Sequence, residues 1–159
     1  MHTLVRALKY PHPHLVYTGH VTAEQFQRDH MKLVILESGA KAKTIKKYLG
    51  KGWIVDACNG HIQDLPVNNK AMWAYKEGEL PNPPWSWTDE KAERKLSTIM
   101  NKASKSSVNE IFIATDPDRE GEFIAWRLND ILSDFDSVKR ISFNEITKDA
   151  VMSAISEPR

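Results

Sequence analysis

Short apolar runs alternate with segments of helical periodicity along most of the chain. The runs KLVIL, WIVDAC, IFIAT and KRISF, at residues 32–36, 53–58, 111–115 and 139–143, have the length and composition of strands. Between and after them, apolar residues recur every three or four positions, which predicts helices over about 38–49, 88–105, 119–132 and 148–155. Strands that alternate with helices favour an α/β fold, with a central parallel sheet of about four strands and helices on both faces.

Capping residues and apolar faces define the expected helices further. Gly50 and Gly52 close the first helix, and Thr88 or Asp89 is placed to cap the second. The second helix gathers its apolar residues on one face: Ala92, Leu96, Ile99, Met100 and Ala103. The third is expected to bury Ile124, Leu128, Ile131 and Leu132.

Two segments lack this regularity. Residues 1–30 hold five of the six histidines, and we expect a poorly structured extension with one short helix before a domain over 31–159. A metal site at His12 and His14 is less favoured, because prolines interrupt the tract. The stretch that ends in PNPPWSW is predicted to be irregular. Its tryptophans either stack on nucleic-acid bases or pack onto the core, and packing is favoured: Trp73, Trp85 and Trp87.

The overall composition sets only broad limits on function. The chain of 159 residues is 41% apolar and 27% charged, which is typical of one globular domain. Its 22 Lys and Arg nearly balance 21 Asp and Glu, so a polyanionic partner would have to be recognised by local clusters of charge. The single cysteine, Cys58, excludes an internal disulfide, and no apolar run has the length of a membrane span. We therefore expect a cytoplasmic protein that makes no membrane contact.

Acidic residues occupy alternate positions directly after the third apolar run. They are Asp116, Asp118, Glu120 and Glu122. Two neighbouring charges about 4 Å apart repel by roughly 4 kcal/mol at a protein surface, so the cluster calls for a cation. Oxygen donors at i and i+2 in extended chain point to the same side, and together with Glu120 they suit Mg²⁺. The alternative is that the acids only complement the positive end of the following helix, although that needs just one or two of them.

Charged residues also follow the first apolar run. Glu37 ends this run as Asp116 ends the third, so neighbouring parallel strands would bring the two carboxyl groups into one crevice. The next helix begins near Ser38, where free N–H groups favour an anion that Lys41 could also reach. The lysines of this helix are either a solvated face or a track for a phosphate backbone. Carboxylates for a metal beside lysines for phosphates indicate phosphodiester chemistry.

Four blocks of the sequence resemble the type IA DNA topoisomerases. They are LVILESGAKAKTIKKYLG, CNGHIQDLP, ATDPDREGEFIAWRL and RISFNEIT, which occur in the family's order and extend from residue 32 to about 155. The resemblance implies a TOPRIM domain, which is a Rossmann-like α/β fold, and an enzyme that cleaves and religates single-stranded or underwound DNA with Mg²⁺. In that family a tyrosine from a separate domain attacks the phosphodiester bond.

The resemblance also implies roles for individual residues. Asp116, Asp118 and Glu120 would bind Mg²⁺, and Glu37 would protonate the leaving 3′ oxygen. Lys41 would stabilise charge on the scissile phosphate, and Arg119 and Glu122 match flanking positions of the acidic motif. Lys41, Lys43, His61 and Asp64 are the positions expected to face DNA.

The chain departs from the family pattern in several places. Gly39 stands where proline is common, Gln63 replaces a frequent arginine, and Arg127 often corresponds to a histidine. None of its tyrosines has the context of the family's nucleophile, so we expect no relaxation activity from this chain alone and expect Tyr-bearing domains in the same or a separate chain. The alternatives are a stand-alone TOPRIM nuclease that uses a metal-bound water, or a non-catalytic DNA-binding module.

Overall fold

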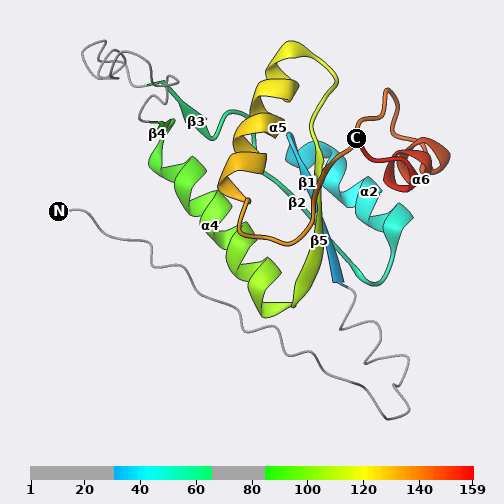
Figure 1. The fold of residues 1–159 in the computed structure, drawn as a ribbon. Coiled ribbons are helices and arrows are strands. Elements are labelled where there is room, and N and C mark those ends of the chain that lie inside the picture. Colours follow the sequence, from blue (N-terminus) through cyan, green and yellow to red (C-terminus); the bar gives the residue numbers. More distant parts are fainter. Residues whose placement is uncertain (1–30, 66–84) are drawn as a thin grey trace.

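The fold is an α/β sandwich, seen in a computed structural model that describes residues 31–65 and 85–159 (Figure 1). The extension over residues 1–30, its short helix and Trp73 lie outside the described residues. The described elements, in chain order, are β1 (Met31–Leu36), the 3₁₀ turn η1 (Gly39–Lys41), α2 (Ala42–Leu49), β2 (Trp53–Ala57), β3 (Gln63–Asp64), β4 (Ser86–Trp87), α4 (Glu90–Lys105), β5 (Val108–Ala114), α5 (Arg119–Ile131), β6 (Val138–Arg140) and α6 (Lys148–Ser156).

The central sheet has four strands in the order β2-β1-β5-β6, and every neighbouring pair is parallel. This confirms the fold class expected from the sequence. The last two strands differ from their predicted bounds: β5 begins at Val108, and β6 ends at Arg140. The amide of Ile141 still donates to Ile113 O at 2.9 Å, so the pairing of β6 with β5 continues one residue beyond the strand.

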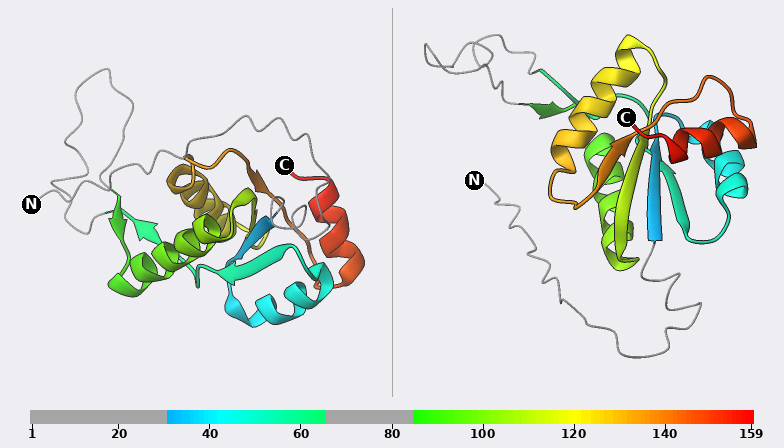
Figure 2. Two further views of the ribbon diagram at one scale, coloured as in Figure 1. Left: turned by 90° about the horizontal axis from the view of Figure 1, so that it is seen from below. Right: turned by 45° about the vertical axis from the view of Figure 1, so that its right-hand side comes forward.

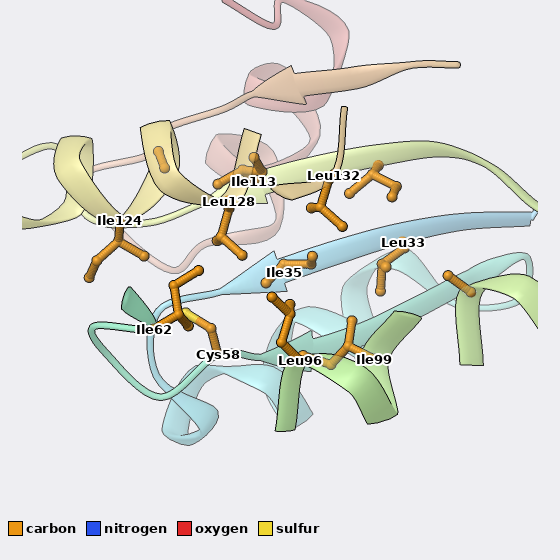
Figure 3. Packing of buried hydrophobic residues seen from close by; sticks show 13 residues of the cluster. Leu33, Ile35, Cys58, Ile62, Leu96, Ile99, Ile113, Ile124, Leu128 and Leu132 are labelled. Atoms are coloured by element: carbon orange, nitrogen blue, oxygen red, sulfur yellow. The ribbon is translucent and has the colours of Figure 1, made fainter. Parts of the chain in front are cut away.

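Helices cover both faces of this sheet, with α4 and α5 on one face and α2 and α6 on the other (Figures 1 and 2). Because side chains alternate along a strand, Leu33 and Ile35 of β1 face α4 and α5, whereas Val34 and Leu36 face α2 and α6. Figure 3 shows the first of these clusters, where side chains from the sheet and both helices interleave. Burial on both faces explains the continuous apolar runs at 33–36 and 111–114 in the two central strands, β1 and β5.

The helix caps follow the residue types at their starts. Asp89 caps α4 by accepting from the Ala92 amide at 2.7 Å. Thr88, the other cap considered, donates instead from Oγ1 to His61 O at 2.9 Å. The expected apolar face of α4 is buried at Leu96, Ile99 and Ala103.

A short antiparallel hairpin was not expected from the sequence. Gln63 and Asp64 of β3 pair with Trp87 and Ser86 of β4, in segments predicted to be turn and irregular chain. Strands of two residues are too short to show an alternating pattern, which is why periodicity could not predict them. In the part of the chain that the structure describes, no helix has both the length and the apolar character that a membrane crossing requires.

Candidate active site

Glu37 and Asp116 lie next to each other at the point where the sheet reverses its strand order. β1 and β5 are parallel neighbours, with Leu36 opposite Ala114, so Glu37 and Asp116 follow at the same edge. The Asp116 amide donates to Glu37 Oε2 at 3.2 Å. Successive connections leave β1 and β5 in opposite directions, which makes this edge the topological switch point where open α/β sheets bind ligands.

The acidic turn, residues 115–118, is held tightly against the start of α5. Asp118 is the N-cap, and its Oδ1 accepts from the Gly121 amide at 2.7 Å. Thr115 Oγ1 donates to Gly121 O at 2.6 Å. A Cβ on Gly121 would lie 2.0 Å from Asp116 O, so only glycine permits this close approach. The motif's glycine therefore has a packing reason, and Asp118 has a local role in helix capping besides any role as a ligand.

Lys41 reaches the acidic turn from the other side. Ser38 caps η1 by accepting from the Ala40 amide at 3.4 Å, and Lys41 ends that turn. Its Nζ lies 2.7 Å from Asp116 Oδ1, in an ion pair whose side chains are 32% and 45% exposed. Asp116 is thus in direct contact with two other proposed residues, with Glu37 through its amide and with Lys41 through its carboxylate.

The remaining proposed residues are spread around this contact. His61 Nε2 lies 3.6 Å from Glu120 Oε1, and the His61 ring packs edge-on against Phe123 at 5.4 Å between centroids. Asp64 Oδ1 accepts from the Leu65 amide at 2.7 Å. Lys43 and Arg119 are exposed, and neither forms an ion pair with any residue in 31–65 or 85–159.

The carboxylates fit a divalent cation by their chemistry, although they are not gathered as ligands. Within the described ranges, no three His, Cys, Asp or Glu side chains are grouped closely enough to hold a metal. The backbone of Asp118 is extended, but its Oδ1 caps α5, whereas Asp116 Oδ1 pairs with Lys41, so the two carboxylates have different partners. Even so, Asp116, Asp118 and Glu120 each keep one carboxylate oxygen that forms no hydrogen bond with the described residues, and hard oxygen donors of this kind suit Mg²⁺.

Arg140 is a residue of this site that the sequence reasoning missed. Its guanidinium donates to Thr115 O at 2.9 Å, to Asp116 O at 3.2 Å and to Glu122 Oε1 at 2.9 Å. The side chain is only 13% exposed, and Glu122 also accepts from Arg159 at 3.3 Å. Arg140 begins the RISFNEIT block at the end of β6, which pairs with β5. Its position at the end of the strand beside the acidic motif could have indicated that it contacts the acidic turn. Glu122 is accordingly an ion-pair partner of Arg140.

Gln63 and Arg127, two residues that differ from the family pattern, contact each other. Arg127, buried on α5, donates from Nη2 to Gln63 Oε1 at 2.5 Å. Its guanidinium lies 4.3 Å from the ring centroid of Trp85, which also packs against Phe123 and Trp126. Trp85 thus packs against rings that lie outside both core clusters, whereas Trp87 packs against the core beneath α4 and α5, as the sequence favoured. The buried Arg127 side chain thus connects the β3–β4 hairpin to α5 through its contacts with Gln63 and Trp85.

An all-parallel, doubly covered sheet with acidic groups at its switch point defines a Rossmann-like α/β domain with a site suited to cations and phosphates. Comparison with known families identifies the family to which this domain belongs. The chain belongs to the Toprim domain family, whose model matches residues 32–146.

The most similar relatives include several proteins named DNA topoisomerase 1. The one from Streptomyces coelicolor is 43% identical over 138 residues, which cover 80% of this chain and 14% of that protein. The one from Rickettsia prowazekii is 43% identical over 135 residues, which cover 81% of this chain and 17% of that protein. The solved structure of full-length topoisomerase I from Thermotoga maritima is 35% identical with a TM-score of 0.65, and the match covers 80% of this chain and 21% of that one. The chain thus spans less than a fifth of the length of the two curated relatives.

Proposed function

We propose that this chain is the Toprim portion of a type IA DNA topoisomerase and supplies the acidic half of its DNA-cleavage site. The observation that carries the proposal is the contact of Asp116 with both Glu37 and Lys41 at the switch point. The names of the curated relatives and the solved structure support the same assignment. As part of this proposal, the protein acts in the cytoplasm on single-stranded or underwound DNA.

The proposed roles are those that the family resemblance implies, and the contacts of Glu37, Lys41 and Asp116 support part of them. Glu37, beside the Asp116 amide, donates a proton to the leaving 3′ oxygen. Asp116, Asp118 and Glu120 hold Mg²⁺, which when bound stabilises negative charge on the phosphate and orients it. Lys41 and the exposed Arg119 pair with phosphate oxygens. Lys43, His61 and Asp64 contribute to the surface that contacts DNA.

The nucleophile of this reaction is proposed to come from a Tyr-bearing domain in the same or a separate chain. Of the tyrosines in this sequence, only Tyr48 lies in the described part, and its hydroxyl donates to Ile146 O at 3.3 Å within the packing of α2. A hydroxyl held in this way does not reach the acidic turn. The 159 residues alone are therefore expected to leave supercoiled DNA unrelaxed.

Isothermal titration with Mg²⁺ tests the metal site. The wild type should bind Mg²⁺, whereas the double variant Asp116→Asn with Asp118→Asn should give no binding heat. Circular dichroism should show that the double variant is still folded, because the substitutions preserve side-chain shape and lie outside the sheet. Equal Mg²⁺ heats for the two proteins would contradict the proposed function.

One observation favours a second candidate, a stand-alone nuclease: Glu37 and Asp116, the proposed acid and a proposed metal ligand, lie in contact within this chain. Metal-bound water would then replace the tyrosine as nucleophile. Incubation of the protein with single-stranded DNA and Mg²⁺ separates the two candidates. Mg²⁺-dependent nicking that persists when all four tyrosines are changed to phenylalanine would favour the nuclease. Mg²⁺ binding without nicking by this chain alone agrees with the topoisomerase portion.

A further inference from the structure

The ion pair between Lys41 and Asp116 joins residues 75 positions apart, at the centre of the proposed site. Among the described lysines and arginines, Lys41 is the one whose side chain contacts a carboxylate of Asp116, Asp118 or Glu120. Asp116 also lies beside the Glu37 carboxylate, which contacts its amide. The ammonium of Lys41 therefore neutralises the acidic turn in the structure as it stands.

We propose that Lys41 is a built-in counter-cation for Asp116, which a divalent cation displaces, and that this displacement makes its ammonium available to a DNA phosphate. The inference deepens the proposed function and rests on it. It assigns Lys41 two alternative partners, the carboxylate before the cation binds and the phosphate afterwards.

The strength of the two interactions supports this exchange. Both side chains of the pair are about one-third to one-half exposed, and ion pairs with this exposure are weak. A divalent cation on Asp116 would carry twice the charge of the ammonium and would repel it across a few ångströms. The ammonium is then expected to leave the carboxylate for the nearest anion, which is the phosphate that the cation also contacts.

This exchange couples the two ligands of the site. Without a divalent cation, Asp116 neutralises the charge of Lys41, so the residue adds little to DNA binding. With the cation bound, that charge is free for the phosphate. Because coupling between two binding sites is reciprocal, DNA should also strengthen binding of the cation, and both effects should depend on Lys41.

Mg²⁺ titration at low ionic strength, without DNA, tests the displacement. Lys41→Gln should bind Mg²⁺ about two- to five-fold more tightly than the wild type, because the cation no longer competes with an exposed ion pair. Lys47→Gln is the matched control: it removes the same charge from an exposed position near the other end of α2. Its Mg²⁺ affinity should change less, because solvent and salt screen the longer separation. Equal or weaker Mg²⁺ binding by Lys41→Gln would overturn the inference.

A labelled oligothymidine provides the second readout, by fluorescence anisotropy with and without Mg²⁺. Mg²⁺ should strengthen oligonucleotide binding by the wild type, and Lys41→Gln should lose most of that Mg²⁺-dependent gain. A loss of affinity by Lys41→Gln that is the same with and without Mg²⁺ would contradict the exchange of partners.

The two hypotheses fail in distinguishable ways. If the wild type and the Asp116→Asn, Asp118→Asn variant give equal Mg²⁺ heats, the proposed function fails and the inference fails with it. If the wild type binds Mg²⁺, the double variant does not, and Lys41→Gln binds no more tightly, then only the role of Lys41 as a counter-cation is wrong. Circular dichroism of each variant establishes that the fold is retained.

Discussion

Gly121 determines how closely α5 approaches the acidic turn. A Cβ there would meet the Asp116 carbonyl oxygen at 2.0 Å, and a backbone oxygen cannot rotate aside as a flexible side chain does. We expect Gly121→Ala to lower the free energy of unfolding by about 1–3 kcal/mol, the usual cost of overpacking. Urea unfolding monitored by tryptophan fluorescence measures the change.

The control for this substitution is Gly39→Ala. A Cβ at Gly39 would lie 3.5 Å from Asn59 Oδ1, an ordinary contact, so the free energy of unfolding should change by less than about 0.5 kcal/mol. A loss as large as that of Gly121→Ala would show that the cost is not specific to the contact with Asp116.

Cys58 lies next to the site and is chemically protected by its surroundings. Burial raises the pKa of its thiol to about 11, and the side chain is almost fully buried beside Leu36 O. We expect the thiol to react slowly with a disulfide reagent at pH 8 in the folded protein, and rapidly in urea. Because the folded-state pKa is raised, the neutral thiol contributes stability that is lost as the pH rises from about 8.5 to about 11. Rapid reaction of the folded protein at pH 8 would contradict this description.

At the scale of elements, Asp56 connects the edge strand β2 to α4. Lys95 and Lys102 of α4 each lie 2.6 Å from one of its carboxylate oxygens. Burial raises the pKa of this carboxyl, but hydrogen bonds from Lys102, Lys95 and the Ala57 amide outweigh it and hold the pKa below its usual range. We expect Asp56→Asn to lower the free energy of unfolding by about 1–3 kcal/mol at pH 7.

The pH dependence gives this prediction a second check. Because the folded-state pKa is lowered, the contribution of Asp56 is present above the unfolded-state pKa of about 3.9 and is lost as the pH falls through the folded-state value. The difference in urea unfolding between wild type and Asp56→Asn should therefore shrink below about pH 4. Glu90→Gln is the control, since among residues 31–65 and 85–159 Glu90 pairs only with Arg94, at an exposed position, and its loss should change the free energy by less than about 0.5 kcal/mol.

Arg140 connects β6 to the acidic turn, and its contacts depend on the shape of the guanidinium group. The group donates to Thr115 O, Asp116 O and Glu122 Oε1 at once, which the single ammonium of lysine cannot reproduce. We expect Arg140→Lys to lower the free energy of unfolding by about 1–3 kcal/mol and to speed hydrogen exchange of the Gly121 amide. Arg159→Lys, at a 59% exposed side chain, should leave that exchange rate unchanged.

At the scale of the whole molecule, the sequence predicted the sheet because each strand carries its own signal. The runs at 32–36 and 111–115 carry apolar residues on both faces, and the parallel sheet buries both faces of these central strands. The ends of the strands were predicted less well where polar residues interrupt the apolar run. Asn109 and Glu110 interrupt the apolar run of β5, so its true start at Val108 was missed.

The sequence predicted that Glu37 and Asp116 lie close together, but it did not predict the side-chain pairings around them. The ends of β1 and β5 follow from topology, and this placed Glu37 near Asp116. Which carboxylate Lys41 would contact, and that Asp118 would cap α5, depend on side-chain orientation after the fold has formed. The same holds for Arg127 and Gln63, which are 64 positions apart. Periodicity carries no information about contacts of this kind.

The distribution of charge over the molecule determines how its affinity for DNA should depend on salt concentration. The net charge is only +1, so attraction to a phosphate backbone has to come from local clusters, and we propose the exposed lysines of α2 for this role. Removing one phosphate contact should reduce the slope of log affinity for single-stranded DNA against log salt concentration by about 0.7. Lys43→Gln, measured with oligothymidine by fluorescence anisotropy, should show this decrease. Lys91→Gln, an exposed lysine of α4 across the sheet, should keep the wild-type slope, and equal slopes for all three proteins would exclude α2 as the DNA-contacting helix.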